Sequence, residues 1–126
     1  NAMATGTPDK KTLTVVITHA PYQGTLARSG LDAALAAAAF DQPVQLIFSG
    51  HGVYNLLEQD SEAAGTRNVS KLIASLPLYD IEPLFVEAAA LAQLGIATTA
   101  LPAGTQIIDK CAISALIDHS DHVVNF

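Results

Sequence analysis

Tryptophan is absent from this sequence of 126 residues, and there is a single cysteine, Cys111. One cysteine excludes an internal disulfide. Aromatic residues make up only 6% of the chain, so the packing of a core depends on Ala, Val, Ile and Leu. No apolar run reaches the roughly 18 residues needed to cross a bilayer, and the polar N-terminal stretch lacks the apolar segment of a signal peptide. The cytoplasm is therefore the expected compartment.

Positive charge is also scarce. Six Lys and Arg stand against twelve Asp and Glu, which gives a formal net charge of −6. The few cations are scattered, so we expect this chain alone to bind neither nucleic acid nor an anionic membrane surface. Charged residues make up only 14% of the chain, with a mean hydropathy of +0.34. So low a charge density indicates that other subunits cover part of the surface, and we expect an oligomer.

Half of the residues are hydrophobic, which supplies one domain of this length with a core. Asn1 and Ala2, ahead of Met3, resemble the remnant of a cleaved tag. We therefore treat residues 1–12 as remnant and flexible N-terminus, and residues 13–126 as one domain.

Short β-branched apolar runs alternate along this domain with stretches of helical spacing. Ser29 is a suitable N-cap for the first expected helix, and Gly95 a suitable stop for the fourth. The alternation predicts an α/β fold, a three-layer α/β/α arrangement with a mostly parallel sheet of about five strands. The expected strands are 13–18, 44–48, 84–86, 96–101 and 123–126, and the expected helices are 30–40, 53–57, 68–76, 88–94 and 107–117.

Polar and aromatic residues follow several of the expected strands. In an open parallel sheet, ligands bind beyond the C-terminal ends of the strands. A histidine at such a position can act as an acid, a base or a hydrogen-bond donor. The simpler interpretation is that it closes a loop or packs against a neighbour. We take five residues at these ends as a candidate pocket or subunit interface: His19, Tyr22, His51, Tyr54 and Glu87.

Several common sites do not fit the sequence. Gly24 and Gly30 lack the Lys-Ser/Thr pair of a phosphate loop. Thr18 and His19 stand where a phospho-receiver domain needs acidic residues, and residues 21–25 match a flavodoxin phosphate loop poorly. The Asp-His-Ser-Asp-His stretch at 118–122 has no strong metal-binding spacing and is interpreted as a solvated turn. We therefore expect no cofactor and no metal.

Cys111 is the only possible thiol nucleophile. It lies on the apolar stripe of the helix expected at 107–117, so we interpret it as a core residue, and apolar burial leaves a thiol unreactive. Sulfur transfer through Cys111 is kept as an alternative.

Five stretches of the sequence have a familiar order and spacing: residues 20–25 (APYQGT), 29–33 (SGLDA), 48–57 (FSGHGVYNLL), 78–82 (LYDIE) and 121–126 (DHVVNF). Together they resemble the DsrE/DsrF sulfur-relay family, in particular its DsrF/TusC type. The resemblance extends over about residues 13–126. It implies a parallel sheet of about five strands flanked by helices.

Members of this family assemble as heterohexamers with two copies each of DsrE/TusD-like, DsrF/TusC-like and DsrH/TusB-like chains. The resemblance therefore implies DsrE/TusD-like and DsrH/TusB-like partners. It also implies a relay of persulfide sulfur, either toward 2-thiouridine at the tRNA wobble position or in sulfur oxidation. The sulfur-carrying DsrE/TusD member holds its cysteine just after strand three, ahead of an Ala-rich helix and a glycine.

The matching position in this chain is Glu87, which precedes residues 88–90 (Ala-Ala-Ala) and Gly95. A carboxylate cannot form a persulfide. The leading hypothesis is therefore a non-carrier subunit that is not catalytic alone but belongs to a sulfurtransferase complex. A stand-alone homo-oligomer that binds a small ligand near His19, His51 and Glu87 remains an alternative.

Overall fold

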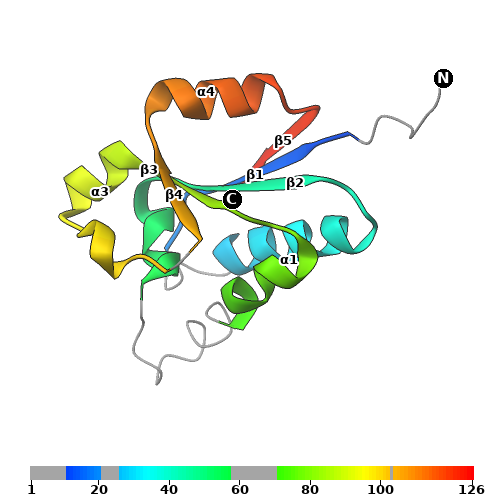
Figure 1. Cartoon of the computed structure of the whole chain (residues 1–126), viewed down its shortest axis with the longest axis horizontal. Helices are drawn as coiled ribbons and strands as arrows, with labels where there is room; N and C mark the ends of the chain where they lie inside the picture. Colours follow the sequence, from blue (N-terminus) through cyan, green and yellow to red (C-terminus); the bar gives the residue numbers. More distant parts are fainter. Residues whose placement is uncertain (1–10, 21–25, 58–70, 103) are drawn as a thin grey trace.

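A single parallel sheet organises the molecule. The computed structural model describes residues 11–20, 26–57, 71–102 and 104–126 (Figure 1). Five strands lie side by side in the order β4-β3-β2-β1-β5, and every neighbouring pair is parallel. The α/β fold with a parallel sheet of about five strands is thereby confirmed. The strands are β1 (Leu13–Ile17), β2 (Val44–Phe48), β3 (Leu84–Glu87), β4 (Thr105–Ile108) and β5 (His122–Asn125).

Helices cover both faces of the sheet. Figure 1 shows α1 on one side of the strands and α4 on the other, so the expected three layers are present. Residues 71–75 are also helical and lead into a 3-10 turn. The α-helices are α1 (Leu26–Ala39), α3 (Ala88–Leu94) and α4 (Lys110–Asp118), and the 3-10 helices are η1 (Gly50–Leu56), η2 (Leu76–Tyr79) and η3 (Thr98–Ala100).

The order of the strands explains why α4 stands apart from α1. From β1 to β4, each new strand is added on the same side of the previous one, whereas β5 pairs with the opposite side of β1. Because crossovers between parallel strands are right-handed, a reversal of direction puts the connecting helix on the other face. The reversal falls between β1 and β5, and such a switch point is where open α/β sheets usually bind ligands.

The main core lies between the sheet and α1. Alternate strand residues, such as Val15 and Ile17, point toward buried Leu31 and Ala34 of the helix. Gly30 lets α1 approach closely, because a Cβ on it would lie 2.4 Å from Ile17 Cδ1. Burial of side chains of this size contributes about 1.5–3 kcal/mol each. Other members of this core are Leu46, Phe48, Val53, Leu76, Ile81, Leu84, Val86, Ala90 and Leu91.

The α4 side of the sheet is thinner. No residue of α4 is fully buried, and all four residues of β5 are exposed. Side-chain hydrogen bonds are found on this side. The buried Thr14 hydroxyl donates to Gln45 Oε1 (3.3 Å) and also bonds with the Ser120 hydroxyl just after α4.

Two expected elements are wrong. Residues 96–101 are not the fourth strand but a coil and η3, and β4 instead comprises residues 105–108. Consequently α4 begins at Lys110 rather than at Ile107. The Asp109 carboxylate accepts from Ala112 N at 2.8 Å, so Asp109 is the N-cap of α4. The expected helix wrongly included Ile107 and Ile108, which are the last two residues of β4.

The beginning of α1 also differs from the expectation. The helix starts at Leu26, so Ser29 lies inside it and caps nothing. Leu, Ala and Arg are favourable helix residues and extend it toward its N-terminus. Arg28 and Asp32, four residues apart, add a weak exposed ion pair at 3.9 Å.

Candidate functional site at the carboxyl edge of the sheet

Glu87 is held at the end of β3 by a neighbouring strand end. The register of β2 and β3 pairs Phe48 with Val86, so the next residues, Ser49 and Glu87, are also neighbours. The Ser49 hydroxyl donates to Glu87 Oε1 at 3.0 Å. Glu87 is half-buried and is the N-cap residue of α3, but its side chain makes no capping bond. The carboxylate is therefore oriented by Ser49 rather than by the start of the helix.

His19 occupies the switch point between β1 and β5. Its Nδ1 lies 2.7 Å from the backbone carbonyl oxygen of Phe126, so this nitrogen carries the proton and donates. Phe126 N in turn donates to Val16 O at 2.8 Å. At this switch point, where other open α/β sheets bind ligands, hydrogen bonds within the chain therefore link the end of β1 to Phe126. This favours the simpler interpretation of His19, in which it closes a loop.

Asn55 contacts the backbone of His19 and was not among the residues predicted from the sequence. Its exposed fraction is 2%, and its Nδ2 donates to the carbonyls of both His19 and Gly52 at 2.8 Å. Its Oδ1 is buried and has no hydrogen-bond partner among the residues that the structure describes. The available signal in the sequence was the polar amide of Asn55 next to apolar Leu56, because a buried amide needs hydrogen-bond partners.

Gly52 fixes how η1 meets β1. A Cβ on Gly52 would lie 1.9 Å from Ile17 O. Ser49 N also donates to Ile17 O at 3.0 Å. The turn after β2 is therefore pressed against the end of β1, which brings Asn55 within reach of His19.

His51 and Tyr54 form a separate pair on η1. Their ring centroids are 5.9 Å apart and tilted by 52°. His51 is exposed and Tyr54 is half-buried. A cavity of about 610 Å³ opens at the end of η1, but its walls are other residues: Leu56, Leu57, Thr99, Ala100 and Pro102.

The four predicted residues that the structure describes, His19, His51, Tyr54 and Glu87, lie at or just after strand ends on one edge of the sheet, and the described contacts do not join them into one cluster. The bonds of His19 and Glu87 run to Phe126 and Ser49, respectively, and not to each other. Tyr22 lies outside the described residues.

The interpretation of Cys111 as a core residue is wrong. Cys111 is the second residue of α4 and is exposed. Because α4 begins later than expected, its half-buried side is formed by other residues: Ala112, Ile113, Leu116 and Ile117. The thiol is accordingly open to solvent.

Residues 118–122 comprise the end of α4, a turn and the start of β5. The turn agrees with the interpretation from the sequence. The Asp121 carboxylate accepts from Thr12 N at 2.8 Å. Among the residues with described positions, no group of three or more His, Cys, Asp or Glu is placed to hold a metal ion. The helices in this same part of the chain are too short or too polar to cross a membrane.

Comparison with known proteins decides the family. A profile of the DsrE/DsrF-like family matches residues 11–126, almost the whole chain. The chain belongs to the DsrE/DsrF-like family. This confirms the resemblance that the sequence showed.

Several bacterial relatives of the chain are TusC homologues. The chain is 33% identical to the TusC homologue of Aliivibrio fischeri over 112 residues, which covers 88% of this chain and 95% of the relative. It is 31% identical to the TusC homologue of Vibrio parahaemolyticus, with 90% and 98% covered. The homologue of Pseudomonas aeruginosa is 29% identical, with 90% and 97% covered. The chain therefore matches these relatives along nearly their whole length.

A solved structure agrees with the fold. The YchN protein of E. coli superposes with a TM-score of 0.81 at 19% identity, covering 92% of this chain and 99% of that one. At that identity the likeness shows the fold alone.

Proposed function

We propose that this chain is the non-carrier subunit of a sulfur-relay complex of the TusBCD or DsrEFH type. One observation carries the proposal: a carboxylate, Glu87, lies at the end of β3 ahead of α3 and is held there by Ser49. By the resemblance, this is the position that holds the carrier cysteine in the DsrE/TusD member. A carrier thiolate attacks the outer sulfur of a donor persulfide, forms a new S–S bond and releases the donor thiolate. A carboxylate cannot form that bond.

The role that remains is to organise the carrier. A DsrE/TusD-like chain would hold the persulfide, and a DsrH/TusB-like chain would complete the assembly in the cytoplasm. The low charge density and the exposed β5 and α4 layer support a subunit that is covered by others. Both destinations of the sulfur, tRNA 2-thiouridine and sulfur oxidation, are compatible with this role.

The test is reconstitution followed by persulfide loading. The chain is co-expressed with DsrE/TusD-like and DsrH/TusB-like chains of the same organism, and the purified complex is treated with a cysteine desulfurase and cysteine. Intact mass spectrometry then locates the added sulfur, which should appear as a 32 Da increment on the DsrE/TusD-like chain. This chain should gain none, and Cys111→Ser should leave the loading unchanged.

The alternative function, sulfur transfer through Cys111, is favoured by the exposure of its thiol. The same experiment separates the two. Sulfur added to this chain that disappears in Cys111→Ser would make it a carrier. A chain that stays monomeric in the presence of both partner chains would contradict the subunit role itself.

A further inference from the structure

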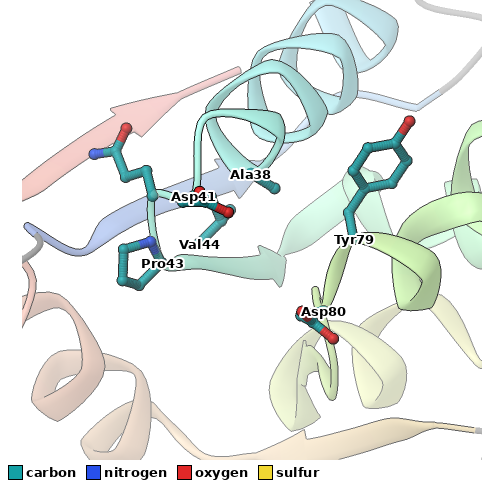
Figure 2. A pocket seen from close by; sticks show the side chains of 7 residues that line it. Ala38, Asp41, Pro43, Val44, Tyr79 and Asp80 are labelled. Atoms are coloured by element: carbon teal, nitrogen blue, oxygen red, sulfur yellow. The ribbon is translucent and has the colours of Figure 1, made fainter.

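A second feature lies at the opposite, amino edge of the sheet. The loop between α1 and β2 and the end of η2 enclose a cavity of about 320 Å³ (Figure 2). Neither element contributes to the Ser49–Glu87 contact. The residues that line the cavity, here named the Asp41–Asp80 pocket, are Ala38, Asp41, Gln42, Pro43, Val44, Tyr79 and Asp80.

Negative charge collects at this pocket for two reasons. Asp41 follows the C-terminal end of α1, and Asp80 is the C-cap of η2. Helix C-termini carry a partial negative charge, which favours a cation rather than a carboxylate. No basic residue lies in the last turn of either helix. Each carboxylate thus adds to the charge of the helix end beside it.

No cation among the residues that the structure describes is seen to pair with these carboxylates. Within the described ranges, the ion pair found is that of Arg28 with Asp32, at the far end of α1. Lys11 is near the pocket, but its contact there is made by its backbone carbonyl, which accepts from Gln42 Nε2 at 3.3 Å. The pocket therefore presents two carboxylates with no ion-pair partner in the described structure.

Two exposed apolar residues are next in sequence to residues that line the pocket. Phe40 precedes Asp41 and is 87% exposed, and Leu78 precedes Tyr79 and is 83% exposed. They are the two most exposed large apolar residues in the part of the chain that the structure describes. Single exposed apolar residues are common, but two that adjoin in sequence the residues lining one charged hollow match the composition of a protein contact, in which apolar area accompanies a polar anchor point.

We propose that the Asp41–Asp80 pocket is a docking site for a different protein, which inserts a Lys or Arg side chain between the carboxylates and packs apolar residues on Phe40 and Leu78. Charge complementarity selects this occupant. A second copy of the chain carries a net charge of −6, and nucleic acid presents phosphates, so both would be repelled. The inference goes beyond the relay function, because it does not depend on sulfur transfer.

The test uses backbone amide NMR of the 13.1 kDa chain. The probes are two blocked tripeptides, acetyl-Leu-Arg-Leu-amide and acetyl-Leu-Gln-Leu-amide. The arginine peptide should shift the amides of residues 40–44 and 79–81 and bind about tenfold more tightly than the glutamine peptide, and 0.5 M NaCl should weaken it. The double variant Asp41→Asn, Asp80→Asn should lose this preference, since asparagine keeps the left-handed backbone but not the charge.

The test has a matched control, and three outcomes would contradict the proposal. Asp118→Asn, at an exposed position of α4, should leave binding of the arginine peptide unchanged. Equal binding of both peptides, or shifts centred elsewhere, would overturn the proposal. So would shifts at residues 40–44 and 79–81 that change with protein concentration alone, since the occupant would then be a second copy. None of these readings requires the relay complex, so the two proposals can fail independently.

Discussion

The Ser49 hydroxyl and the Glu87 carboxylate are hydrogen-bonded at 3.0 Å across the ends of two neighbouring strands. The parallel register of β2 and β3 places them there, because it pairs the residues just before them. The orientation of the Glu87 carboxylate is therefore set by a serine from the neighbouring strand end. The contribution of this contact to the stability of the fold can be measured on this chain alone, without a partner protein.

Replacement Ser49→Ala should lower the free energy of unfolding by about 1 kcal/mol, because a partly buried carboxylate loses one hydrogen bond. Urea unfolding followed by circular dichroism measures this. Ser29→Ala, on the exposed side of α1, is the control and should be neutral or slightly stabilising. Equal effects of the two replacements would show that the Ser49 bond contributes nothing in solution.

Gly52 and Gly50 offer a matched pair two residues apart. A Cβ on Gly52 would meet the backbone of β1, whereas a Cβ on Gly50 has nothing within 4 Å. Gly52→Ala should therefore destabilise the protein by about 3 kcal/mol or more. Gly50→Ala should cost roughly 1–2 kcal/mol, because Gly50 has a φ of +53°. The denaturant midpoint of Gly52→Ala should therefore be lower than that of Gly50→Ala. The reverse order would contradict the close approach of η1 to β1.

Asn55→Ala should destabilise the chain by about 2 kcal/mol or more, since two carbonyls lose a buried donor. Asn55→Asp is the sharper test. At neutral pH the introduced carboxylate has no proton to donate, so it should be at least as damaging. As the pH falls, the carboxyl becomes protonated and regains one donor, so the difference from the parent protein should shrink. A difference that does not vary with pH would argue against the two amide bonds.

The exposure of Cys111 predicts that the folded protein reacts with one equivalent of a thiol reagent such as dithionitrobenzoate. The rate should lie within about tenfold of the rate in denaturant, because no packing shields the sulfur. Cys111→Ser should show no reaction. Labelling that begins only after unfolding would instead restore the interpretation of Cys111 as a core residue.

Much of the sheet could be predicted from the sequence, for a clear reason. Residues 44–48 and 84–86 are short apolar runs bounded by Pro and Gly or by an Ala-rich helix, and a buried parallel strand leaves that signature. Both were located within one residue. The helix at 88–94, with Gly95 in the left-handed conformation as its stop, was also predicted correctly.

The edge strand β4 could not be read the same way. Its residues are Thr105 to Ile108, and three of the four are at least partly exposed, so no apolar run marks it. The more apolar stretch at 96–101 competed for the assignment. The N-cap residue Asp109 was the local signal that would have separated the strand from α4.

The candidate site was predicted by location rather than by contact. That His19 and Glu87 follow strands was readable, since strand ends are local features. Their partners were not, because Phe126 lies 107 residues from His19 and Ser49 lies 38 residues from Glu87. Such contacts depend on the order of the strands in the sheet. The local residue pattern of one sequence does not reveal that order.

Strand β5 completes the sheet beside β1, and Thr12 N bonds to a carboxylate 109 residues further along the chain. Pairing at that separation forms slowly, because a long loop must close before the contact stabilises it. During synthesis, β1 through β4 can assemble while one side of β1 still has an open edge. Until β5 has emerged from the ribosome, that edge is available to other strands, and the nascent chain is most exposed to mispairing during this interval.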